Sequence, residues 1–153
     1  MGGGGSVGYA LRYPEKFCAC YAMSAWLGNN KQLQHAQQNS KSKFYYLQTA
    51  VDSLAATKVL TNATTDERKT ISNVAWFIDC GDDDFLLDQS LEFYQAMRHL
   101  RLPAQLRVRD GNHNWEYWHN ALRICLPFVS RNMGEKKIST SQTHNLTKNN
   151  QQK

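Results

Sequence analysis

Two short loops carry side chains suited to acid–base chemistry. Residues 81–84 (Gly-Asp-Asp-Asp) follow an apolar run that predicts a buried strand, and residues 111–113 (Gly-Asn-His) follow an alternating run that predicts the next strand. In open parallel sheets, functional side chains lie just beyond the carboxyl ends of the strands. An acid after one strand and a histidine after the next match the second half of a Ser…Asp…His order. In such a triad the carboxylate orients the imidazole, which takes a proton from the serine hydroxyl.

Each loop also has a simpler interpretation that its spacing leaves open. Aspartates that follow a strand often cap the next helix, and Asp82 or Asp83 is expected to do so here. A histidine in a glycine–asparagine turn is often a surface residue, which would leave His113 without a chemical role.

Hydrophobic periodicity gives the elements that must position these loops. The order is helix, strand, long polar insertion, strand, helix, strand, helix, which predicts an α/β domain with a largely parallel sheet flanked by helices. We expect a glycine-rich helix at 3–12 that packs its small face tightly, a strand at 17–24, a polar loop at 29–42, a helix at 44–60, a strand at 73–80, a helix at 87–100, a strand at 104–109, and a helix at 115–133 that Pro127 kinks or interrupts. Residues 1–133 are expected to form the domain, and 134–153 a polar, disordered tail.

Three sequence motifs resemble those of a known family. They are Gly-Asp-Asp-Asp-Phe-Leu at 81–86, Arg-Asp-Gly-Asn-His-Asn-Trp-Glu-Tyr-Trp at 109–118, and Met-Gly-Gly at 1–3 with Tyr-Pro-Glu-Lys-Phe at 13–17. Together they resemble the esterase family of α/β-hydrolases that includes esterase D and feruloyl-esterase-like enzymes, in the portion that begins just after the nucleophilic serine. The resemblance implies an incomplete α/β-hydrolase fold, the C-terminal part of its sheet.

The resemblance also implies roles for individual residues. Asp84 aligns with the acid of the triad and His113 with its base, while the backbone N–H of Met1 aligns with part of the oxyanion hole. Trp118 aligns with a tryptophan near the active-site wall, although a core-facing position on the last helix is an equal alternative. The implied activity is hydrolysis of small acyl or carbohydrate esters through an acyl-enzyme, with no cofactor or metal ion.

The nucleophile departs from the family pattern, because it would be the residue just before Met1. We therefore expect the chain to be a fragment that lacks the serine and to depend on the missing N-terminal half of the domain as its partner. The alternative is a non-catalytic, truncated gene product. Gly4-Gly5-Ser6-Val7-Gly8 matches the G-x-S-x-G pattern, but no strand can precede it, so Ser6 is not expected to be the nucleophile.

Composition excludes several other classes of protein. Of the net charge of +5 over 153 residues, the tail at 134–153 contributes +3 through four lysines and one acid, so the basic balance is weak evidence for nucleic-acid binding. No apolar run reaches the roughly 18 residues of a membrane span. The four cysteines form no CxxC pair, which argues against zinc. The compartment is not predicted; a secreted or periplasmic location would require a signal peptide upstream of Met1.

Overall fold

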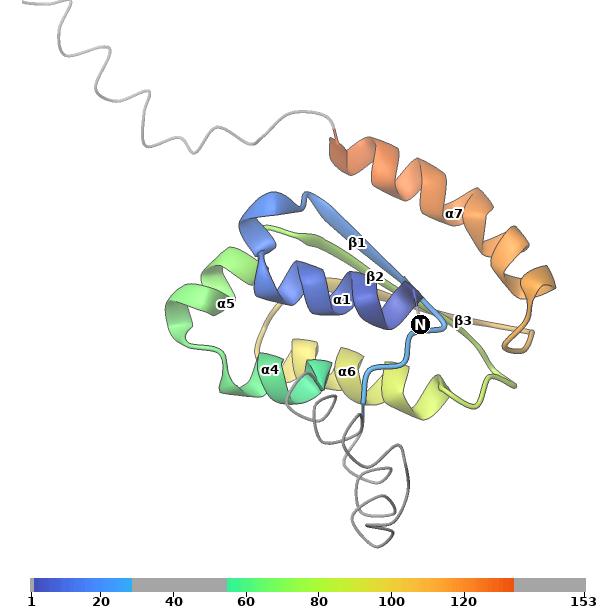
Figure 1. Cartoon of the computed structure of the whole chain (residues 1–153), viewed down its shortest axis with the longest axis horizontal. Coiled ribbons are helices and arrows are strands. Elements are labelled where there is room, and N and C mark those ends of the chain that lie inside the picture. The colour runs from blue at the N-terminus through green and yellow to red at the C-terminus, as the bar shows by residue number, and fades with distance from the viewer. Residues whose placement is uncertain (1, 29–54, 134–153) are drawn as a thin grey trace, which may run out of the picture.

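The computed structural model describes residues 2–28 and 55–133 (Figure 1). Met1, the expected loop at 29–42, most of the expected helix at 44–60 and the tail at 134–153 lie outside the described residues. The elements are α1 (Gly2–Arg12), η1 (Pro14–Lys16), β1 (Ala19–Met23), α4 (Ala56–Asn62), α5 (Thr65–Ile71), β2 (Ala75–Gly81), α6 (Leu87–His99), β3 (Ala104–Arg109) and α7 (Trp115–Met133).

The three described strands form one parallel sheet in the order β1-β2-β3. In its register Cys20 pairs with Trp76, and Ile78 pairs with Leu106. From Trp76 to its end the central strand β2 is buried, as expected for a parallel strand that is covered on both faces. The α/β fold class predicted from the sequence is therefore confirmed.

One face of the sheet is covered by α1, α4 and α6 and holds the apolar core. The sheet contributes Cys20, Ala22, Trp76 and Ile78 to it, and the helices contribute residues that include Phe93. The indole N–H of Trp76 donates to the Ile71 carbonyl at 3.0 Å, so this buried polar group has a partner. Side chains alternate along each strand, so the four strand residues of the core all lie on the same face of the sheet.

The opposite face is covered by α7, which lies across the sheet from α4, α5 and α6 (Figure 1). Phe77 stacks on Tyr21 at 4.7 Å between ring centroids and meets Phe128 of α7 edge-on at 5.2 Å. The helix continues through Pro127, so the expected interruption does not occur. Pro127 lies on the exposed side of α7, where water can satisfy the carbonyl that loses its hydrogen bond.

The start of α1 packs directly against the carboxyl end of β1. A Cβ atom at Gly3 would lie 2.4 Å from the Met23 carbonyl oxygen, and one at Gly4 would lie 2.2 Å from that of Trp26. Only glycine permits this approach, which confirms the tight small face predicted for the first helix. The N-terminus of α1 is therefore held at the sheet edge where the strands end.

Two features are absent from the part of the chain that the structure describes. Within residues 2–28 and 55–133, no helix is long and apolar enough to cross a membrane. Over the same ranges, no three His, Cys, Asp or Glu side chains gather closely enough to hold a metal ion.

Candidate active site

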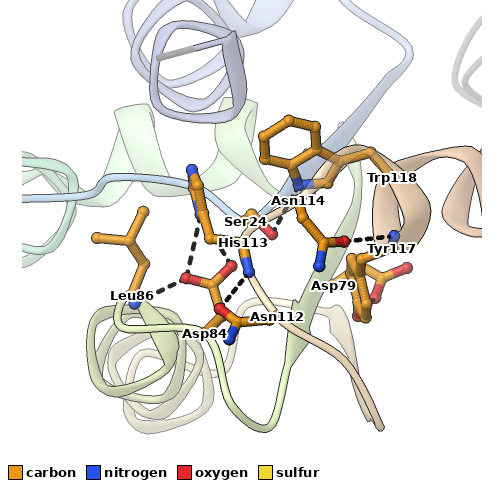
Figure 2. Close-up of polar contacts among 9 residues, drawn as sticks. All are labelled: Ser24, Asp79, Asp84, Leu86, Asn112, His113, Asn114, Tyr117 and Trp118. Carbon is orange, nitrogen blue, oxygen red and sulfur yellow. Dashed lines mark hydrogen bonds and ion pairs between the residues drawn. The ribbon is translucent and has the colours of Figure 1, made fainter.

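Asp84 and His113 meet at the carboxyl edge of the sheet (Figure 2). The His113 Nδ1 atom lies 2.9 Å from Asp84 Oδ2 and 3.1 Å from Asp84 Oδ1. The Asp84 side chain is fully buried, while that of His113 is 24% exposed. The contact expected between the two loops is present, and it joins a buried carboxylate to an imidazole that solvent can reach.

Hydrogen bonding defines which nitrogen of His113 carries the proton. An ionised carboxylate can only accept, and Asp84 Oδ1 already accepts the backbone N–H of Leu86 at 2.9 Å. Nδ1 of His113 must therefore donate, so in the neutral imidazole Nε2 carries the free lone pair. In Figure 2 this second ring nitrogen points away from Asp84. The arrangement leaves Nε2, rather than Nδ1, available to a further partner.

Backbone and side-chain bonds join the two loops to each other. The Asp82 N–H donates to the Arg109 carbonyl at 2.9 Å, and the Asp83 N–H donates to the Gly111 carbonyl at 3.1 Å. In return, Asp82 Oδ1 accepts the Gly111 N–H at 3.0 Å. A Cβ atom at Gly81 would lie 2.1 Å from the Gly111 oxygen, so the loops approach as closely as glycine allows.

The expected role of Asp82 or Asp83 as a cap of the next helix is wrong. The N-cap residue of α6 is Leu86, and no side chain caps this helix. The physical reason is that the carboxylate of Asp82 finds a nearer donor across the loops, the Gly111 N–H, which sequence spacing does not reveal.

Aromatic side chains surround His113. Trp118 meets the imidazole edge-on at 5.0 Å, Phe85 lies 4.8 Å from it, and Trp115 lies 5.1 Å from Trp118. Phe85 and Trp115 are both 71% exposed. The indole N–H of Trp118 donates to Ser24 Oγ at 3.1 Å. Trp118 is half-buried beside the imidazole, so the structure places it at this site.

Two candidate nucleophiles, Ser6 and Cys80, are hydrogen-bonded and protonated, respectively. Ser6 is exposed, and its hydroxyl donates back to the Gly2 carbonyl at 2.9 Å within α1. Burial, together with the neighbouring Asp84 carboxylate, raises the pKa of Cys80 to about 12, so this thiol stays protonated at neutral pH. Met1 lies outside the described residues, and its predicted oxyanion role stays a prediction.

A polar cluster beneath the site was missed by sequence analysis, which took Asp79 as part of an apolar strand. Asp79 is fully buried on β2 and accepts two contacts from Arg109 Nη2, at 2.8 and 3.0 Å. The hydroxyls of Tyr21 and Tyr117 also donate to it. Burial and the Asp79 carboxylate raise the pKa of both tyrosines. The sequence did contain a signal for this cluster, namely an acid within an apolar run, because a buried charge requires partners.

Comparisons with known proteins agree with this geometry. The sequence profile of the family described as "Putative esterase" matches residues 1–128. A ferulic acid esterase of known structure is 48% identical, with a TM-score of 0.76 over 88% of this chain and 49% of its own. An S-formylglutathione hydrolase of Staphylococcus aureus is 25% identical, with a TM-score of 0.63 over 84% of this chain and 47% of its own.

An acetyl esterase of Caldicellulosiruptor saccharolyticus is 21% identical over 140 residues, which cover 86% of this chain and 52% of the relative. The chain thus spans about half the length of the relatives that it matches. The family profile nevertheless covers most of this chain, including both loops and the helices that hold them. The chain therefore belongs to the esterase family, whose structural neighbours are α/β-hydrolases.

Proposed function

We propose that this chain supplies the acid and the base of a serine carboxylic-ester hydrolase. The observation that carries the proposal is the contact between the buried Asp84 carboxylate and His113 Nδ1 at 2.9 Å. In this mechanism Nε2 of His113 takes the proton of a serine hydroxyl as the serine attacks the ester carbonyl. The resulting imidazolium, stabilised by Asp84, then protonates the departing alcohol.

The second half of the reaction uses the same two residues. His113 removes a proton from water, which attacks the acyl-enzyme, and the imidazolium then returns the proton to the serine oxygen as the acid is released. Every step moves protons and an acyl group among side chains, substrate and water, so the mechanism calls for no cofactor or metal ion.

We further propose that the nucleophilic serine comes from a segment that would precede Met1 in a longer protein. In support, Gly3 and Gly4 let the start of α1 pack against the end of β1 and the residues after it, where Ser24 Oγ accepts the indole N–H of Trp118. A serine just before Met1 would thus approach the site beside Trp118 and His113. The Met1 N–H would then face the oxyanion, as the family resemblance implies. The chain's coverage of about half of its relatives agrees with this division.

For the substrate, we propose a carbohydrate ester of an aromatic acid. Phe85 and Trp115 present exposed rings on either side of His113 and Trp118. Flat apolar surfaces of this kind stack on aromatic groups. The relative that is 48% identical is described as a ferulic acid esterase, which favours an aromatic acyl group over the small acyl group of the acetyl esterase.

The alternative is a truncated product with no activity of its own. It is favoured by the edge of β1 that, among the described strands, has no partner opposite β2. An unpaired parallel strand exposes N–H and C=O groups that promote aggregation. Expressed alone, the chain is expected to aggregate and to leave activated esters intact.

A fusion protein separates these possibilities. The N-terminal half of the ferulic acid esterase, up to its nucleophilic serine, is joined to Met1 of this chain. The fusion protein is expected to hydrolyse methyl ferulate faster than methyl acetate. His113→Ala should lower turnover by about 10⁴-fold, whereas Ser6→Ala should leave it unchanged. A fusion protein that melts cooperatively but hydrolyses neither ester would overturn the proposal.

A further inference from the structure

Asp79 forms the centre of a buried polar cluster that joins four elements. Its carboxylate lies on β2 and accepts bonds from Tyr21 of β1, Arg109 of β3 and Tyr117 of α7. Arg109 also lies under the Tyr117 ring, 4.7 Å from the ring centroid. The cluster lies on the α7 face, on the opposite side of the sheet from the apolar core.

Tyr117 also touches the turn that carries His113. A Cβ atom at Gly111 would lie 2.5 Å from Tyr117 Cδ2, so the tyrosine ring fills the space beside this glycine. Gly111 itself has a φ of +142°, which L side chains rarely adopt. The Tyr117 ring therefore supports the start of the turn.

The other end of the turn also contacts Tyr117, here through the backbone N–H of the tyrosine. The Tyr117 N–H donates to Asn114 Oδ1 at 3.0 Å (Figure 2). His113 thus lies between two residues, Gly111 and Asn114, that both contact Tyr117. The hydroxyl of Tyr117 is in turn held by Asp79.

We propose that Tyr117, held by Asp79, is the positioning residue that sets the imidazole of His113 against Asp84. The proposal rests on the function of His113 proposed above. It gives the buried Asp79 an indirect role at the site, because Asp79 acts through Tyr117. Catalytic groups need positioning within fractions of an ångström, so release of this support should impair the contact between Asp84 and His113.

Tyr21 provides a matched control. Its hydroxyl donates to the same Asp79 carboxylate, but it lies on β1 and stacks on Phe77, away from the turn. Tyr21→Phe and Tyr117→Phe each remove one donor from Asp79 and keep a ring in place. A purely structural cluster predicts the same outcome for both, whereas a positioning role predicts a difference.

The test measures the low-field proton NMR signal of the His113 Nδ1–H in the fusion protein, assigned by its loss in His113→Ala. Tyr117→Phe is expected to accelerate exchange of this proton with water by about tenfold or more and to lower kcat by about tenfold with KM unchanged. Tyr21→Phe should leave the signal and kcat as they are. Equal behaviour of the two variants, in either direction, would overturn the proposal.

A second variant covers the case in which Tyr117→Phe does not fold. Asp79→Asn keeps the shape of the side chain but removes the charge that holds the Tyr117 hydroxyl. Faster exchange in Asp79→Asn supports the positioning role, and an unchanged signal contradicts it. The signal arises whether or not an ester is hydrolysed, so loss of the proposed function and loss of the positioning role give different results.

Discussion

The two faces of the central strand β2 have different chemistry and different consequences. Trp76 and Ile78 face α1, α4 and α6 and belong to a continuous apolar cluster. Phe77 and Asp79 face α7, where an ion pair and two tyrosine hydroxyls lie among aromatic rings. Apolar packing is non-directional, whereas hydrogen bonds fix orientation. We infer that the first face holds the sheet together and the second sets the position of the helix beside His113.

The largest expected effect on stability comes from the apolar face. Trp76→Ala removes the side chain that packs on Phe93 and should lower the free energy of unfolding by about 3–5 kcal/mol. Denaturant unfolding of the fusion protein measures this loss. Turnover per folded molecule should stay near that of the parent; a large fall in kcat would break the proposed division between the faces.

The α7 face should respond to Asp79→Asn in both stability and activity. The substitution removes the charge that Arg109 pairs with and should destabilise by about 2–3 kcal/mol, since charge-assisted bonds are lost. Unlike Trp76→Ala, it should also lower kcat, because Tyr117 loses its anchor. Unfolding and steady-state kinetics on one sample check this, and a loss of stability with unchanged kcat would argue against a link to His113.

The tyrosines of this face should make stability fall at high pH. Burial and Asp79 raise the pKa of Tyr21 and Tyr117, so above pH 10 the unfolded chain releases protons that the folded chain retains. The free energy of unfolding should then decrease by up to about 1.4 kcal/mol per pH unit for each tyrosine. Unfolding between pH 8 and 11 (the full contribution is present at the lower end) tests this, and the variant with Phe at both positions should show a smaller slope.

The smallest expected effect concerns the bridge between the loops. Asp82→Ala removes the acceptor of the Gly111 N–H and should cost about 0.5–1.5 kcal/mol, because the bond is exposed. Asp83 joins the loops through its backbone, so Asp83→Ala is the matched control and should be nearly neutral. Equal thermal midpoints for the two variants would show that the Asp82 side chain does not stabilise the contact between the loops.

Sequence patterns predicted the parts of the site that depend on strand order alone. Asp84 and His113 follow neighbouring parallel strands, so their loops must meet at one edge once the sheet is recognised. The cluster around Asp79 could not be predicted in the same way. Its partners lie on three other elements, and only the register of β2 and β3 and the docking of α7 bring Arg109 and Tyr117 to one carboxylate.

The contact of Asp82 with the other loop was not predicted from the sequence, for a related reason. Local spacing favours a helix cap, but the bond that forms is to Gly111 on the other loop. Such contacts depend on how closely two turns approach, which here follows from the absence of a Cβ atom at Gly81. The periodicity of apolar residues carries no information about that distance.

The most direct test of the proposed acid–base pair is the trapping of an acyl-enzyme. The fusion protein is mixed with p-nitrophenyl acetate, quenched in acid and digested for mass spectrometry. A single acetyl adduct is expected on the serine that precedes Met1, formed in a rapid burst that His113→Ala abolishes. An adduct on Ser6 or Ser24 would contradict the placement of the nucleophile before Met1. An adduct that forms equally fast in His113→Ala would contradict the assignment of His113 as the base.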